Sequence, residues 1–246
     1  MSDNFTNKFM ANEKNLALLN ETMWGPNGIR QAEELASFFT ITKDMKILDL
    51  GCGLGLSAVY LVQQYGATVF ATDLYADPTE NHERFKSLGI ADKIIPMTVD
   101  ATQPMPFAKR YFDVVFSVGA YNMFGDTEEM LPNFIPYIKK GGYIAVAFPG
   151  LKYDFGNNVP KEMQPFWDVP EVARYIRGIE WWRDLFYKEK GIEILSIGEQ
   201  ACHDIAWKEY LATRDPNKED EKWDLDMMAA ESGKYFNTIQ LIAKVI

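Results

Sequence analysis

Apolar residues along this chain follow two alternating patterns: short runs of branched aliphatic or aromatic side chains, and longer stretches with helical spacing. The short runs, which predict strands, lie at residues 46–50, 68–72, 94–99, 112–117, 143–148, 192–198 and 236–246. Helical spacing occurs at residues 12–22, 29–39, 57–65 and 79–88. Because strands and helices alternate between residues 46 and 149, the pattern predicts an α/β fold with a parallel sheet.

Prolines mark two places where this simple pattern must be modified. Pro96 falls inside the third predicted strand, and proline is tolerated in a sheet mainly at an edge or a bulge, so this strand should lie at an edge. Pro132 and Pro136 fall between residues 128 and 140, where a crossover helix is expected. Proline inside a helix costs about 3 kcal/mol, so this helix should be short, kinked or displaced.

The six tryptophans all lie outside residues 46–149, the segment that contains the predicted parallel strands. A sheet core that prefers branched aliphatic side chains explains part of this segregation. An aromatic-rich cap over one end of the sheet, built from residues outside that segment, explains the rest.

Composition narrows the classes of function. The net charge is −10 and no basic run is longer than Lys139 and Lys140, which argues against binding to nucleic acid. The apolar stretches are too short to cross a bilayer and the N-terminus has no signal-peptide pattern, so we expect a cytoplasmic protein that binds no membrane. Cys52 and Cys202 have neither disulfide-framework nor metal-ligand spacing, so no metal site is expected.

The sequence "LDLGCGLG" at residues 48–55 places a glycine-rich turn between a predicted strand and a predicted helix. Its spacing is G-x-G-x-G, and Leu56 occupies the position of the third glycine in the dinucleotide fingerprint G-x-G-x-x-G. Asp49 precedes the first glycine by two residues, where a carboxylate opposes a pyrophosphate but suits a ligand with an ammonium group. The turn therefore disfavours a nicotinamide-dependent oxidoreductase, which stays open as an alternative.

Polar side chains also stand at the ends of the next three predicted strands. Asp73 follows the strand at 68–72, where an acid can bond both hydroxyls of a ribose. Asp100 follows the third strand and can accept a hydrogen bond from an adenine amino group, and Ser117 ends the fourth strand. Because ligands of open α/β sheets bind outside the carboxyl ends of the strands, these residues should converge on one crevice.

The motifs "ILDLGCGLG", "ATDLY", "VDATQPMPF", "YFDVVFSVGA" and "IKKGGYIAVAF" together resemble the class I S-adenosylmethionine-dependent methyltransferases, most of all a small-molecule branch related to quinone-biosynthesis enzymes. The resemblance implies a Rossmann-like, seven-stranded, mostly parallel sheet with a reversed last strand, helices on both faces and a helical cap. It implies one methyltransferase domain over residues 1–246. Its expected parts are N-terminal helices or a lid at 1–40, a cofactor-binding core at 46–149, cap elements with the sixth strand at 150–235, and the last strand at 236–246.

The same resemblance implies S-adenosyl-L-methionine as the cofactor. Asp49 and the glycine turn would face its methionine moiety, Asp73 its ribose, and Asp100 with Ala101 its adenine. The stretch "MWGPNG", which contains Trp24, resembles a loop that closes over the cofactor in related proteins. The expected cofactor-binding residues are Trp24, Asp49, Gly51, Cys52, Gly53, Gly55, Asp73, Leu74, Asp100, Ala101 and Ser117.

The methyl acceptor is expected to be a small molecule whose reacting atom (oxygen, nitrogen, sulfur or carbon) the sequence leaves open. Tyr121 and Asn122 follow the fourth strand, where the methyl group should point, and His203 should approach from the cap as a candidate general base. The alternative for His203 is a loop histidine bonded to backbone. The alternative for the whole chain is a non-catalytic protein that binds S-adenosylmethionine or S-adenosylhomocysteine.

Overall fold

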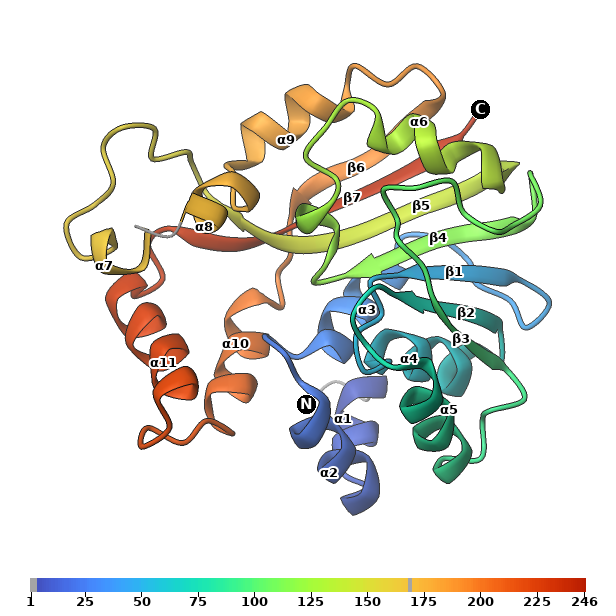
Figure 1. The fold of residues 1–246 in the computed structure, drawn as a ribbon, viewed down its shortest axis with the longest axis horizontal. Helices are drawn as coiled ribbons and strands as arrows, with labels where there is room; N and C mark the ends of the chain where they lie inside the picture. Colours follow the sequence, from blue (N-terminus) through green and yellow to red (C-terminus); the bar gives the residue numbers. More distant parts are fainter. Residues whose placement is uncertain (1–3, 168–169) are drawn as a thin grey trace.

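The computed structural model describes residues 4–167 and 170–246, and one seven-stranded sheet forms its centre (Figure 1). The strands are β1 (Lys46–Leu50), β2 (Thr68–Asp73), β3 (Ile94–Thr98), β4 (Phe112–Val118), β5 (Ile138–Leu151), β6 (Ile192–Glu199) and β7 (Phe236–Val245). Their order across the sheet is β3-β2-β1-β4-β5-β7-β6. Strands β1 to β5 pair in parallel, whereas β7 pairs antiparallel with both β5 and β6. The predicted Rossmann-like sheet with a reversed last strand is confirmed.

Strand β3 stands at one edge of this order, where its proline is tolerated. Pro96 is the register partner of Ala71 in β2. Because no strand lies on the other side of β3, the missing N–H of Pro96 removes no hydrogen bond on that side. The expectation of an edge strand, drawn from this one proline, is confirmed.

Helices cover both faces of the sheet. They are α1 (Phe5–Met10), α2 (Glu13–Thr22), α3 (Gly28–Ala36), α4 (Leu56–Tyr65), α5 (Pro78–Ser87), α6 (Met130–Phe134), α7 (Gln164–Trp167), α8 (Pro170–Tyr175), α9 (Ile179–Phe186), α10 (His203–Leu211) and α11 (Glu219–Glu231). Figure 1 shows α3, α4 and α5 on one face and α6 and α9 on the other. Alternate residues of β5 serve the two faces: Ala145 packs in the cluster with α3 and α4, and Ile144 in the cluster with α6 and α9. None of the described helices is long and apolar enough to cross a membrane.

The proline-containing crossover between β4 and β5 is a short helix followed by a tighter turn. Pro132 lies in the first turn of α6, where a backbone N–H has no partner within the helix and its loss costs little. Pro136 lies in the 3-10 turn η2 (Ile135–Tyr137), which ends the helical segment. Of the three outcomes expected for this segment, the structure shows the short helix.

The tryptophans do not all belong to a cap. Trp182 of α9 is fully buried on the face of the sheet, and its ring centroid lies 4.5 Å from that of Phe148 in β5. Trp167 packs instead on Phe155, with ring centroids 4.7 Å apart, in a separate cluster that includes Leu151 and Phe236 at the ends of β5 and β7. The prediction of a cap therefore missed Trp182, because α9 turns one face of its helix onto the sheet.

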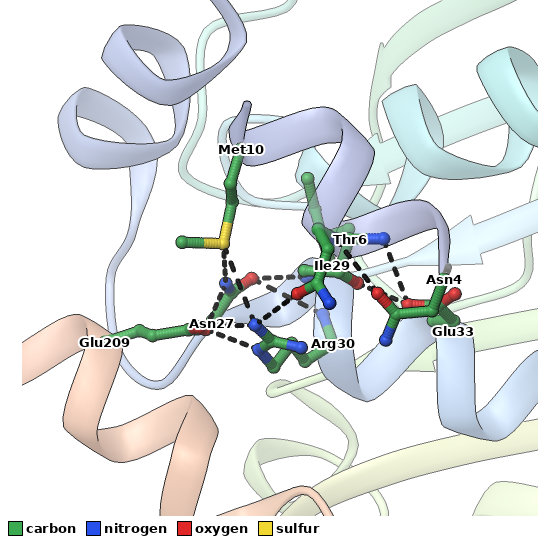
Figure 2. Close-up of polar contacts among 9 residues, drawn as sticks. Asn4, Thr6, Met10, Asn27, Ile29, Arg30, Glu33 and Glu209 are labelled. Atoms are coloured by element: carbon green, nitrogen blue, oxygen red, sulfur yellow. Dashed lines mark hydrogen bonds and ion pairs between the residues drawn. The ribbon is translucent and has the colours of Figure 1, made fainter. Parts of the chain in front are cut away.

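A polar cluster fastens the N-terminal helices to the rest of the chain (Figure 2). We call Asn27, Arg30, Glu33 and Glu209 the N-terminal clasp. The Arg30 guanidinium donates from Nε to Glu209 Oε2 at 2.7 Å and from Nη2 to Glu209 Oε1 at 2.5 Å, and Asn27 donates to the same carboxylate at 2.8 Å. Glu209 belongs to α10, so this ion pair joins α3 to an element far away in the sequence.

The other acid of the clasp holds the first helix. Glu33 accepts hydrogen bonds from the backbone N–H groups of Phe5 and Thr6 at 2.7 and 3.1 Å, at the N-terminus of α1 (Figure 2). A carboxylate at this end satisfies free N–H donors and complements the helix dipole. Together the two acids position the chain that leads into the turn between α2 and α3.

Loss of the clasp should cost more stability than loss of an exposed ion pair. Glu209→Ala leaves the largely buried Arg30 guanidinium without its charged partner, so the free energy of unfolding should fall by about 1.5–3 kcal/mol. The control is Glu83→Ala in the exposed Lys86–Glu83 pair, which should change it by less than about 0.5 kcal/mol. Urea unfolding followed by circular dichroism measures both; equal losses would contradict a structural role for the clasp.

Candidate active site

A cavity of about 540 Å³ opens where the carboxyl ends of β1 to β5 meet. Its walls come from the turn after β1, the residues at or just after the ends of β2 to β5, the chain between α2 and α3, and α8. The volume lies within the range of pockets that bind small molecules, and its place is the usual ligand position in an open α/β sheet.

The glycine turn after β1 is shaped by close contacts on both sides. Gly51, Gly53 and Gly55 all have left-handed φ angles, of 70°, 53° and 92°. A methyl group on Gly51 would lie 2.3 Å from Cβ of Ala120, and one on Gly55 would lie 2.5 Å from the ring of Phe85. Any side chain at either position would therefore push apart the elements that surround the cavity.

Asp49 lies beneath this turn with one carboxylate oxygen free. Its Oδ2 accepts a 2.6 Å hydrogen bond from Ser57 Oγ, and Ser57 lines the cavity. Its Oδ1 is buried and has no hydrogen-bond partner within residues 4–167 and 170–246. Burial raises the pKa of Asp49 from its ordinary value of 3.8 to about 7. A buried acceptor of this kind suits a cationic donor.

Two acids line the cavity directly: Asp73, the last residue of β2, and Asp100, which follows β3. Asp73 accepts hydrogen bonds from the N–H groups of Gly53, Tyr75 and Ala76 at 2.9, 2.8 and 3.0 Å, so it ties the glycine turn to the end of β2. Asp100 uses Oδ1 to accept from both the N–H and the hydroxyl of Thr102. Those two bonds lower the pKa of Asp100, which keeps it ionised at neutral pH.

Trp24 forms part of the wall opposite the glycine turn. Its indole lies 3.7 Å from the position that a Cβ of Gly53 would occupy, although two thirds of the residue is exposed to solvent. The expected residues that line the cavity are Trp24, Gly51, Cys52, Gly53, Asp73, Leu74, Asp100 and Ala101. The structure thus brings together most of the expected cofactor-binding set.

Five of the expected residues besides His203 do not line the cavity, for reasons of packing: Asp49, Gly55, Ser117, Tyr121 and Asn122. Asp49 is fully buried beneath the glycine turn. Ser117 is fully buried and its hydroxyl donates to the carbonyl of Leu50 at 2.7 Å. Tyr121 and Asn122 begin the 3-10 turn η1 (Tyr121–Met123), which directs both side chains into the protein. Gly55 serves the contact with α5 rather than the cavity.

His203 also lies away from the cavity. It is the first residue of α10, it is buried, and its Nδ1 lies 3.1 Å from the hydroxyl of Thr238 in β7. Burial lowers the pKa of His203, so the ring is neutral at physiological pH. Trp207 and Tyr210 of the same helix are not cavity residues either; the Tyr210 hydroxyl donates to Asp224 at 2.6 Å. Proton transfer to His203 from the cavity would need an intermediary.

Sequence reasoning missed several residues of the cavity wall. They are Gln31, Met123, Phe124, Pro149 and Tyr175. Gln31 carried a signal, because it is a polar residue on the apolar face of α3 that buries Ile29, Ala32 and Leu35. Tyr175 carried none, since nothing in the sequence places α8 over the end of β5.

Within the described part of the chain no group of three His, Cys, Asp or Glu residues could hold a metal ion.

Comparisons with known proteins agree with this arrangement. Residues 47–142 match the family model described as a methyltransferase domain. The chain is 27% identical over 121 residues to the methyltransferase GfsG of Streptomyces halstedii, and 28% identical over 137 residues to a 2-methyl-6-phytyl-1,4-hydroquinone methyltransferase of Synechocystis. These alignments cover 49% and 56% of this chain, but only 43% and 41% of the relatives. The chain therefore spans less than half the length of these curated relatives.

Solved structures show the same fold over a longer stretch. Geranyl diphosphate C-methyltransferase from Streptomyces coelicolor, solved with Mg²⁺, geranyl diphosphate and S-adenosyl-L-homocysteine, superposes with a TM-score of 0.70 at 18% identity. The superposition covers 95% of this chain and 84% of that one. The segment that matches the family model contains β1 to β4 and the glycine turn. Over residues 47–142 this chain is accordingly similar to methyltransferase domains.

Proposed function

We propose that this chain transfers a methyl group from S-adenosyl-L-methionine to a small-molecule acceptor. The observation that carries the proposal is the set of three acids, Asp49, Asp73 and Asp100, at the ends of three adjacent strands around one glycine turn. The order of their strands in the sheet, β1, β2 and β3, matches the order of the parts of the cofactor: an ammonium group, a ribose with two hydroxyls, and an adenine with an amino group. All three parts are hydrogen-bond donors, and all three residues are acceptors.

The residues present fit this cofactor. Asp49 does not line the cavity, so its free Oδ1 would receive the ammonium group of the methionine moiety after a shift of the glycine turn or of Ser57, which lies between it and the cavity. Asp73 would take the ribose hydroxyls, sharing the carboxylate with its backbone donors. Asp100 has Oδ2 available for the adenine amino group, because both of its described hydrogen bonds use Oδ1. Trp24 would cover the glycine turn from the solvent side.

The protein's contribution to the reaction would be alignment in a dry pocket. The cofactor supplies an electrophilic methyl group on a sulfonium, which an acceptor displaces in line. The glycine turn after β1 and the residues after β4 contact each other, which would fix the relative positions of two walls of the cavity. The chain between α2 and α3 would exclude water from the cavity. Cys52 is no candidate nucleophile, because burial raises the pKa of its thiol well above the ordinary value.

We further propose that the whole of residues 1–246 acts as one methyltransferase unit with residues 1–40 as its lid. Thr22, Met23, Trp24, Gly25 and Pro26 of this segment line the cavity. Helix α3 of this segment is fixed in place, because its core side chains are buried and Glu34 accepts from the N–H groups of Ala201 and Cys202 at 2.7 and 2.8 Å. Opening of the lid would therefore involve the chain before Asn27.

Loss of Asp73 should weaken binding of S-adenosylhomocysteine. Asp73→Ala removes a charged acceptor from the cavity wall, so the dissociation constant measured by calorimetry should rise about tenfold or more. The matched control is Asp92→Ala, an exposed acid outside the cavity, which should leave affinity unchanged. NAD should bind neither protein measurably. Unaltered affinity in Asp73→Ala, with a normal unfolding transition, would remove Asp73 from the site.

Affinity should also depend on pH through Asp49. The ammonium group of the ligand favours the ionised carboxylate, whose pKa is about 7 in the free protein, so binding should strengthen as the pH rises toward 7 and level off above it. Asp49→Asn cannot ionise, so its affinity should be nearly constant over this range and weaker than that of the wild type at pH 8. A wild-type affinity that falls or stays constant between pH 5 and 7 would contradict the assignment.

Ligand binding should make the lid less mobile. Amide hydrogen exchange at residues 10–28 should slow when S-adenosylhomocysteine is added, because a loop that closes over a ligand loses its open states. The matched reference is α11, which lies outside the cavity and should exchange equally in both states. Equal protection of residues 10–28 with and without ligand would show that this segment has no gating role.

A further inference from the structure

The cavity has two halves of different chemistry, in the order of the strands. Near β3 and β2 it contains the carboxylates of Asp100 and Asp73. Near β4 and β5 its wall consists of apolar and aromatic side chains, with Met123 and Phe124 after β4, Pro149 in β5, and Tyr175 in α8. The proposed cofactor accounts for the acidic half, so the apolar half is the space left for the acceptor.

No lysine or arginine lines the cavity within residues 4–167 and 170–246, and residues 1–3 and 168–169 contain neither type. The arginine next in sequence to Tyr175 is already paired, because Arg174 donates to Asp126 at 3.1 Å. A carboxylate or phosphate placed in the apolar half would lose its water without gaining a positive partner. Such a loss is costly, and the nearby carboxylates add repulsion.

Gln31 of α3 is a polar residue of the cavity wall. Its side chain is almost fully buried, and its amide Nε2 donates to the hydroxyl of Thr238 at 3.4 Å. The same hydroxyl lies 3.1 Å from Nδ1 of the neutral His203, so it can accept from Gln31 and donate to the ring. This chain of contacts fixes the amide and leaves its carbonyl oxygen Oε1, which has no partner among the described residues, as an acceptor at the cavity wall.

We propose that the methyl acceptor is an uncharged, largely apolar molecule that presents one hydroxyl or N–H group, and that Gln31 Oε1 receives this hydrogen bond. The inference rests on the proposed function, since it takes the acidic half to be filled by the cofactor. It assigns His203 and Thr238 a positioning role, through the orientation of Gln31. It also separates the acceptor of this chain from carboxylate and phosphate compounds.

The charge preference can be measured as binding to protein saturated with S-adenosylhomocysteine. The probes are para-propylphenol and para-hydroxyphenylpropionate, which share a ring and chain length and differ in the carboxylate. Calorimetric titration should give a dissociation constant at least about tenfold lower for the phenol, a difference of about 1.4 kcal/mol. Equal or tighter binding of the carboxylate would overturn the inference.

A variant that adds a cation should change that preference. Met123→Lys places an ammonium group in the apolar half, so the ratio of the two dissociation constants should move about tenfold toward the carboxylate. Tyr153→Lys makes the same change of charge at a residue that is equally exposed but outside the cavity, and should leave the ratio unchanged. The same shift in both variants would show a general charge effect and overturn the assignment of this half.

The role of Gln31 needs a third probe, para-propylanisole, which has no donor. Gln31→Leu should weaken the phenol about fivefold or more and leave the anisole within about twofold of wild type. Equal loss for both probes would make Gln31 a packing residue only. If S-adenosylhomocysteine binds but none of the three probes does, this inference fails alone; if S-adenosylhomocysteine does not bind, the proposed function fails with it.

Discussion

The site depends on how closely two turns approach each other at the top of neighbouring strands. Gly51 after β1 and Ala120 after β4 are so close that one added methyl group would place two carbon atoms 2.3 Å apart. The parallel pairing of β1 with β4 sets this distance, because Asp49 is in register with Phe116 a few residues earlier. The floor of the cavity is therefore fixed by the sheet, and the loops above the floor supply the remaining walls.

The walls are held by interactions of another kind. On one side the backbone donors of the glycine turn and of the loop after β2 share the carboxylate of Asp73. On the other, the clasp between Arg30 and Glu209 holds α3 against α10, and α3 carries Gln31 into the cavity. A rigid floor with walls fastened by a few charged hydrogen bonds is an arrangement in which a lid can move without disturbing the sheet.

The sequence predicted the sheet well because its signals are local. The edge position of β3 follows from Pro96, and the position of the crevice follows from glycines and acids at strand ends. Strand β5 proved much longer than its predicted run at both ends. It begins at Ile138, before a register shift in the pairing with β4 at Gly141 and Gly142, and it continues to Leu151 in pairing with β7. The acceptor side was predicted less well: η1 turns Tyr121 and Asn122 inward, and no local pattern distinguishes a side chain after a strand that faces a cavity from one that faces the core.

The place of β7 in the sheet has a consequence for synthesis of the protein. It is the last strand in chain order, yet it lies between β5 and β6 and pairs with both over most of its length. While the ribosome is making the chain, β5 can complete its pairing with β4 but keeps an open hydrogen-bonding edge until residues 236–245 have emerged. Unpaired edges next to apolar side chains are templates for association between chains. The half of the molecule that carries the glycine turn can thus form early, while the sheet as a whole is exposed to misassembly until its final step.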